Sequence, residues 1–216
     1  MNFDWRVSTA RAREIQQELA PRIIRSGKAA KLEFIAGADI SVNRFAKTGK
    51  AAVVVLSYPE MQVIEIQTVT APIEFPYVPG LLTYREAPLV LAAFEKLAIT
   101  PDLVLIDGQG IAHPRRIGLA SHLGLCLGLP TIGCAKSRLI GEHAELAREA
   151  GSFAELMDEN EVIGAAVRTK DGVNPLFISI GHLVDLPSAI KWTLACCRGF
   201  RLPEPTRQAH MAAGML

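Results

Sequence analysis

Residues 103–116 combine side chains that phosphate chemistry uses. A short apolar run ends on Asp107, a Gly-x-Gly turn follows, and the segment closes with His113, Arg115 and Arg116. Because short apolar runs bounded by glycine are typical of buried strands, we expect Asp107 at the carboxyl end of a strand, where open α/β sheets bind ligands. The arginines supply fixed positive charge, and the glycines let a ligand approach the backbone. A carboxylate metal ligand beside a phosphate clamp suits phosphodiester chemistry, although Asp-Gly is also an ordinary turn.

Two further carboxylates and a lysine are candidates for the same site. Asp39 interrupts an apolar strand pattern, so it either faces solvent near the strand end or joins Asp107 in one site. Two close carboxylates repel each other unless a cation lies between them, and Mg²⁺ prefers oxygen ligands. Glu86 is the third carboxylate, but its spacing from Thr83 is that of a capping box. On spacing alone, we favour the capping role over a role in the site. Lys136 follows a predicted strand and is either a solvated residue or a group beside a phosphate.

A proline-bounded loop and the histidines are weaker candidates. The loop 76–80, Pro-Tyr-Val-Pro-Gly, is either extended with Tyr77 docked on the core, or a rigid wedge that stacks on or replaces a nucleobase. His210 and the histidine of the 103–116 segment lie closest to other candidate residues. The remaining three histidines are expected to be structural or exposed: His122 and His182 structural, His143 exposed.

Length and composition limit the class of protein. The 216 residues, half of them hydrophobic, suffice for one domain over residues 1–216 with a full core. No apolar run is long enough to span a membrane, and the first six residues lack a signal-peptide core, so we expect a cytoplasmic or, in a compartmented cell, nucleocytosolic protein. Four cysteines in apolar surroundings, without Cys-x-x-Cys spacing, predict reduced core residues: Cys126, Cys134, Cys196 and Cys197.

The charge distribution is uneven although the net charge is only +1. Residues 1–31 carry seven Lys and Arg against three Asp and Glu, whereas acids concentrate in residues 142–161. The positive segment is either a nucleic-acid contact or a solvated amphipathic helix, and we favour the helix.

The hydrophobic pattern predicts an α/β fold in which helices flank a mixed sheet. Helices are expected over 8–19, 83–97, 117–127 and 188–197, and strands over 33–42, 51–57, 62–70, 102–107, 130–135, 162–168 and 176–180. The first three strands have short connections and are therefore antiparallel, whereas strands reached through a helix run parallel to their predecessors. The acidic segment 142–160 is expected to be a loop or helix, and the residues after 200 a proline-containing tail.

Taken together, these segments resemble the endonuclease V family over residues 9–210. The matching blocks, in order, are Gly37-Ala-Asp39, Pro76-Tyr-Val-Pro-Gly80 with Tyr84-Arg-Glu86, Asp107-Gly-Gln-Gly-Ile-Ala-His113-Pro-Arg-Arg116, Thr131-Ile-Gly-Cys-Ala-Lys136, Asn174-Pro-Leu176, Gly181-His182 and Arg201-Leu-Pro-Glu-Pro-Thr-Arg207. The resemblance implies a ribonuclease H-like fold, which agrees with the predicted element order.

The resemblance also implies an activity and its residues. The activity is hydrolysis of the second phosphodiester bond 3′ to a deaminated base such as hypoxanthine, with Mg²⁺ as cofactor (or Mn²⁺ in its place), leaving a 5′-phosphate and a 3′-hydroxyl. The matching metal-site residues are Asp39, Glu86, Asp107 and His210, which overrides the capping-box interpretation of Glu86, and Lys136 matches a lysine beside the attacked phosphate. Residues that match substrate-contacting positions are Tyr77, Gly80, Leu82, Gly108, His113, Arg115 and Arg116. One departure is Gln109, where many members carry a histidine. Glutamine cannot carry a proton, so we expect no acid-base role at this position.

Three alternatives differ in substrate or class. We expect a monomer that acts on DNA containing deoxyinosine or other distorted sites, but the motifs do not distinguish it from a ribonuclease acting on inosine in RNA. A non-catalytic binder of distorted nucleic acid is the second alternative, which the presence of all three carboxylates disfavours. A small-molecule phosphotransferase is the weakest, because no Gly-x-x-x-x-Gly-Lys loop is present.

Overall fold

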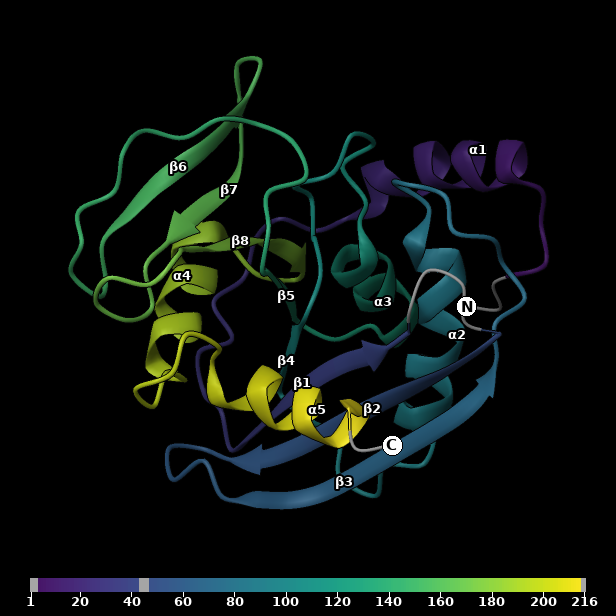
Figure 1. The fold of residues 1–216 in the computed structure, drawn as a ribbon, viewed down its shortest axis with the longest axis horizontal. Helices are drawn as coiled ribbons and strands as arrows, with labels where there is room; N and C mark the ends of the chain where they lie inside the picture. The colour runs from purple at the N-terminus through teal and green to yellow at the C-terminus, as the bar shows by residue number, and fades with distance from the viewer. Residues whose placement is uncertain (1–3, 43–46, 215–216) are drawn as a thin grey trace.

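The centre of the computed structural model, which describes residues 4–42 and 47–214, is one eight-stranded sheet (Figure 1). The strands are β1 (Phe34–Ser41), β2 (Thr48–Ser57), β3 (Val63–Pro72), β4 (Leu103–Ile106), β5 (Thr131–Ala135), β6 (Phe153–Asp158), β7 (Glu161–Val167) and β8 (Leu176–His182), arranged as β3-β2-β1-β4-β5-β8-β7-β6. β1, β2 and β3 are antiparallel, β4 and β5 continue the sheet parallel to β1, and β8, β7 and β6 are antiparallel to their neighbours. The predicted mixed sheet is confirmed.

Helices cover both faces of this sheet. They are α1 (Thr9–Leu19), followed by the 3-10 helix η1 (Ala20–Arg22), then α2 (Leu82–Phe94), α3 (Leu119–Leu127), α4 (Leu186–Ala195) and α5 (Glu204–Gly214). Apolar side chains of α2 and α3 pack on one face in a cluster with Ala36, Val53 and Val104. Those of α4 and α5 pack on the other face in a cluster with Ile35 and Val54. The alternation of side chains along each strand therefore supplies both cores.

Two elements differ from the sequence prediction. β6 lies in the acidic segment that was expected to be a loop or helix, because pairing with β7 through a tight turn outweighs the local preference of its residues. α5 occupies the expected tail, and Pro205 is its second residue, where the missing N–H has no intrahelical role. α5 matters for function because it carries His210.

The start of α2 also differs from the prediction. The helix begins at Leu82, its N-cap residue Leu81 makes no side-chain hydrogen bond, and Thr83 is buried inside the first turn. The predicted capping box of Thr83 and Glu86 was therefore wrong. Glu86 is left without a capping role.

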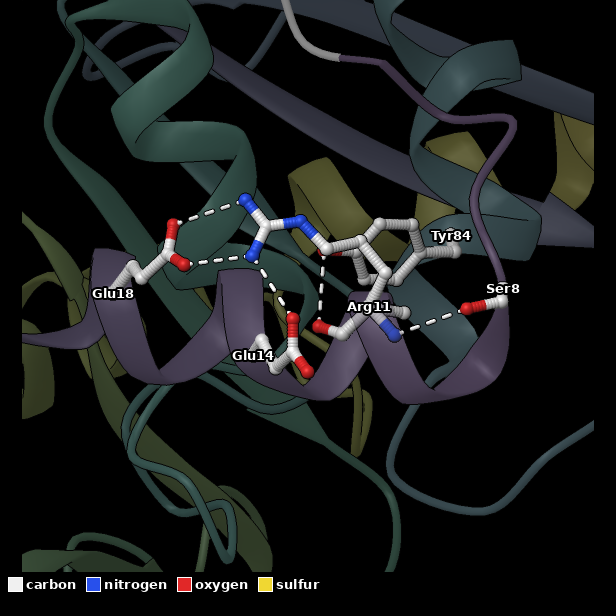
Figure 2. A network of polar contacts seen from close by, with 6 residues as sticks. Ser8, Arg11, Glu14, Glu18 and Tyr84 are labelled. Carbon is white, nitrogen blue, oxygen red and sulfur yellow. Dashed lines mark hydrogen bonds and ion pairs between the residues drawn. The ribbon is translucent and has the colours of Figure 1, made fainter.

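One arginine of α1 is paired with two acids of the same helix, as Figure 2 shows. The Ser8 side chain accepts a hydrogen bond from the backbone N–H of Arg11, whose guanidinium contacts Glu14 and Glu18. Tyr84 of α2 donates a hydrogen bond to a backbone carbonyl of α1. Residues 9–19 thus form the exposed helix that we expected for this part of the positive segment.

The cysteines are reduced, as the sequence predicted. All four cysteines are free thiols, with Cys134 and Cys196 buried and the other two partly buried. Across residues 4–42 and 47–214, no helix has the length and apolar character that crossing a membrane would require.

Candidate active site

The register of two parallel strands brings Asp39 and Asp107 together. Ala38 of β1 pairs with Ile106 of β4, so the next residue of each strand lies at the same carboxyl edge of the sheet. The backbone N–H of Asp107 donates to the carbonyl of Ala38 at 3.0 Å. Asp39 is only 8% exposed, so it is not a solvated residue at a strand end.

A glycine lets α5 reach this edge. A Cβ on Gly37 would lie 1.9 Å from the carbonyl oxygen of Pro205, so only glycine allows the start of α5 to rest directly on β1. Figure 1 shows α5, in yellow, lying across β1 and β2. The helix then places His210 Nδ1 2.6 Å from Asp39 Oδ2. Ligand atoms of Asp39, Asp107 and His210 all lie within 4.8 Å of one another.

Lys136 adds a cation to the same cluster. It follows β5, and its Nζ forms an ion pair with the carboxylate of Asp107. The same Nζ lies 3.4 Å from His210 Nδ1. The structure thus brings Lys136 to the position at the sheet edge that its place after a strand predicted.

Glu86 lines the same cavity from α2 but lies outside the 4.8 Å group. Burial and the charges of Asp39 and Asp107 raise the pKa of Glu86 to about 7, against the opposing charge of Arg85. Burial and the charge of Asp39 also raise the pKa of Asp107. The carboxylates are therefore crowded, and their ionised forms repel one another.

This donor set fits a divalent cation. Carboxylates that are buried together without enough positive charge are destabilised as anions, and a cation between them removes the repulsion. Carboxylate oxygens are the preferred ligands of Mg²⁺, and imidazole nitrogen is accepted by first-row transition ions. Asp39 and Asp107, with His210 beside them and Glu86 across the cavity, are the residues able to hold such an ion.

The cavity beside these residues has a volume of about 450 Å³, within the roughly 300–1,000 Å³ of ligand pockets. Its lining includes all but two of the residues matched to substrate-contacting positions: Tyr77, Gly80, Leu82, Gly108 and His113. Tyr77 is 42% exposed, so it is not docked on the core. Leu81, in contrast, is fully buried and anchors the loop from below.

The carbonyl of Gly80 is the fixed point of the proline-bounded loop. Gly80 has φ +77°, a left-handed conformation that favours glycine. Its carbonyl accepts hydrogen bonds from Gln16 Nε2 at 3.2 Å and Arg115 Nη2 at 2.7 Å, and contacts His113 Nε2 at 3.0 Å. Three donors on one oxygen hold the loop, and Tyr77 three residues before it, against the rest of the fold. Gln16 has no local sequence signal for this role, because its partners lie far along the chain.

His113 is neutral and hydrogen-bonded through both ring nitrogens. Its Nδ1 accepts from the backbone N–H of Arg115, so Nε2 carries the proton and donates to Gly80. Burial, together with the Arg115 charge, lowers the pKa of His113 to about 4. His113 therefore supports the loop and is poorly suited to donate protons at neutral pH.

The two arginines of this segment lie outside the cavity lining. Arg115 contacts Gly80 and donates to Gln16 Oε1 at 2.6 Å. Arg116 forms ion pairs with Asp158 at 2.8 Å and Glu161 at 2.6 Å, at the turn between β6 and β7. The structure thus gives Arg116 two acidic partners within the chain, which the sequence did not indicate.

Three positions named in the sequence analysis make structural contacts. Gln109 lines the cavity, and its Nε2 donates to the carbonyl of Ser137 at 2.9 Å, so it ties together the loops after β4 and β5. His122 is fully buried against Trp5 and Tyr84, and His182 accepts the backbone N–H of Ile24, which agrees with structural roles.

Known proteins resemble this chain over nearly its full length. The sequence pattern of the family described as Endonuclease V matches residues 17–211. Endonuclease V of Dehalococcoides mccartyi (strain CBDB1) is 51% identical over 213 residues, which span 99% of this chain and 96% of that protein. The crystal structure of Endonuclease V from Streptomyces avermitilis superposes with a TM-score of 0.91 at 41% identity, covering 97% of this chain and 92% of that one. Ciona intestinalis Endonuclease V, in complex with a 24mer DNA containing an inosine followed by a ribo-adenosine, gives a TM-score of 0.82 at 29% identity, covering 94% and 95%.

Proposed function

The chain belongs to the endonuclease V family and has the ribonuclease H-like sheet that its sequence predicts, and from that premise we propose that it cuts DNA at the second phosphodiester bond 3′ to deoxyinosine. One observation carries the proposal: Asp39, Asp107 and His210 converge within 4.8 Å beside a cavity of about 450 Å³. The inosine-containing DNA bound by the Ciona relative supports the choice of lesion.

The metal site of this proposal consists of Asp39, Asp107, Glu86 and His210, with Mg²⁺ as the ion and Mn²⁺ as a substitute. A divalent ion held by these residues would supply activation of water and neutralisation of charge on the attacked phosphate. Lys136, already paired with Asp107, stabilises negative charge that develops on the same phosphate. The products are a 5′-phosphate and a 3′-hydroxyl.

Lesion recognition in this proposal uses the wedge loop and the cavity. Tyr77 enters the gap that the extruded base leaves in the stack, and Gly80, Leu82 and Gly108 line the slot that receives the base. Extruding a base costs a few kcal/mol, and least where the base is mispaired, so hypoxanthine is favoured over a matched purine. The slot must distinguish one exocyclic group, which requires rigid polar groups, and the Gly80 backbone is held by three donors.

The test is a nicking assay on a duplex with one deoxyinosine, with and without Mg²⁺. Wild type should nick only the inosine strand and only with the metal, and Asp107→Ala should lose activity. Asp185→Ala is the matched control, because Asp185 caps α4 outside the site. Full activity of Asp107→Ala would remove Asp107 from the mechanism, and absence of inosine-dependent nicking by wild type would refute the proposed function.

A second candidate is cleavage of RNA that contains inosine. The DNA in the Ciona complex carries a ribo-adenosine after the inosine, so that relative accommodates a ribonucleotide beside the lesion. Matched single-stranded RNA and duplex DNA substrates, compared by kcat/KM, separate the two candidates. A role in DNA repair, a cytoplasmic location and a monomeric state stay predictions that accompany the DNA proposal.

A further inference from the structure

A second concavity, of about 510 Å³, adjoins the candidate active site and shares Lys136 and Arg138 with it. We call it the flanking cavity. Besides those two residues, its lining includes Arg201, Asn174 and His143. It shares no residue with the loop that carries Tyr77 and Gly80. The two cavities therefore meet on the Lys136 side.

Two sequence blocks that the metal site leaves unused converge on the flanking cavity. Asn174 belongs to one block of the family resemblance and Arg201 begins another, and 27 residues separate them along the chain. The Arg201 side chain joins them, because its Nε donates to the carbonyl of Asn174 at 2.9 Å. The cavity is therefore a built part of the fold and not a chance hollow between loops.

Lys136 is paired with Asp107, but among the described residues no carboxylate neutralises the arginines of the flanking cavity. Of the described residues, none that lines it is acidic. Arg201 donates only to backbone carbonyls: besides Asn174, Nη2 contacts those of Lys136 at 2.7 Å and Pro175 at 3.0 Å. Arg138 is exposed, and no hydrogen bond or ion pair involves its side chain among residues 4–42 and 47–214. Arg116, by comparison, is neutralised by two acids.

We propose that the flanking cavity binds a backbone phosphate of the lesion strand on the 3′ side of the cleaved bond. Uncompensated guanidinium groups with free donors are suited to phosphate oxygens. The inference rests on the proposed function for its direction. If the base occupies the slot beside Gly80 and the cleaved bond lies 3′ to it, beside Lys136, then the strand that passes Lys136 continues 3′ into this cavity.

The proposal is tested by combining the variant Arg138→Gln with DNA in which single phosphates are made neutral, and by asking whether the two changes weaken binding independently. Arg138 is the probe because its side chain supports no other group, whereas Arg201 also holds the Lys136 backbone. Single methylphosphonates are placed at successive positions along an inosine duplex, and binding is measured by fluorescence anisotropy without divalent metal. Positions are counted from the inosine, so that the scan requires no cleavage. Arg22→Gln is the matched control, because Arg22 is an exposed arginine outside both cavities.

The expected result is coupling confined to one or two positions just 3′ of the bond to be cut. There the methylphosphonate weakens wild-type binding several-fold but does not weaken binding by Arg138→Gln further. The variant should also reduce, by about 1, the steepness with which the logarithm of the DNA-binding constant falls with the logarithm of salt concentration. Arg22→Gln should keep the wild-type pattern of sensitivity.

Three results would overturn the inference: additive losses at every position, coupling only 5′ of the inosine, or coupling only in the complementary strand. These outcomes differ from failure of the proposed function, which is the absence of inosine-dependent nicking by wild type. A protein that nicks at inosine but shows no such coupling keeps its function and loses this subsite.

Discussion

Two kinds of carboxylate occur in this molecule. Glu204, at the start of α5, is only 7% exposed but accepts hydrogen bonds from Arg207 and Gln208, and chiefly the Arg207 bond lowers its pKa. Glu86, in the candidate site, faces other carboxylates, and its pKa is raised to about 7. Glu204 is thus matched with donors, whereas Glu86 faces carboxylates whose repulsion a cation would relieve.

Replacing each of these acids by its amide gives the largest expected contrast. Glu86→Gln should lower nicking by more than about 100-fold, since even outer partners of metal ligands typically cost 10–100-fold. Without metal at pH 8, the same change should raise the free energy of unfolding by on the order of 1 kcal/mol, because it removes a repelling charge.

Glu204→Gln should behave in the opposite way. It should keep most activity and lower the free energy of unfolding by about 1–3 kcal/mol, because it weakens charge-assisted hydrogen bonds to a buried group. Urea unfolding and nicking assays on both variants check the pair. The comparison breaks if Glu86→Gln destabilises the metal-free protein as much as Glu204→Gln does.

The approach of α5 to β1 gives the next effect. Gly37→Ala places a methyl group against the backbone of Pro205, so α5 must shift and His210 must move away from Asp39. We expect a loss of about 1–3 kcal/mol of stability and a larger proportional loss of activity. Gly214→Ala, in α5 itself, is the control, because nothing lies within 4 Å of its added Cβ. Equal activity of the two variants would show that the position of α5 does not matter.

The pKa of His113 predicts a pH dependence of stability. Its pKa is about 4 in the folded protein, below its usual 6.5, so between these values the unfolded chain binds more protons. Stability should therefore fall as pH decreases from about 6.5 to 4, and His113→Asn should flatten part of this slope. Urea unfolding of both proteins from pH 4.5 to 7.5 measures it. Parallel pH profiles for the two proteins would contradict the buried neutral histidine.

The smallest effect is expected at Arg116. Its side chain is 20% exposed and forms ion pairs with Asp158 and Glu161, so Arg116→Gln should cost about 1 kcal/mol or less. Because these acids already neutralise the guanidinium, the salt dependence of DNA binding should not change. A shallower salt slope for this variant would restore the phosphate role that the sequence predicted.

The sequence predicted the site better than it predicted the elements that complete the site. Asp107 and Lys136 follow apolar strand patterns and Asp39 interrupts one, so strand pairing alone brings them to one edge. Glu86 was ambiguous because capping-box spacing is a local pattern, whereas its position in the cavity depends on the packing of α2. The capping-box spacing is thus a local signal, whereas the position of Glu86 in the cavity depends on long-range packing.

The elements that were missed depend on partners far along the chain. α5 was expected to be a tail because its prolines disfavour helix, yet contact with β1 at Gly37 stabilises it. β6 forms because β7 pairs with it, and Arg116 is neutralised by acids that lie 42 and 45 residues farther along. Such contacts have no periodic signal in the sequence.

The central claim is that separated carboxylates converge to hold a divalent ion. A calorimetric titration of the substrate-free protein with Mn²⁺ tests this claim without relying on catalysis. Binding should be clear for wild type, nearly lost for Asp107→Asn and unchanged for Asp185→Asn. Equal Mn²⁺ affinity of wild type and Asp107→Asn would contradict the account.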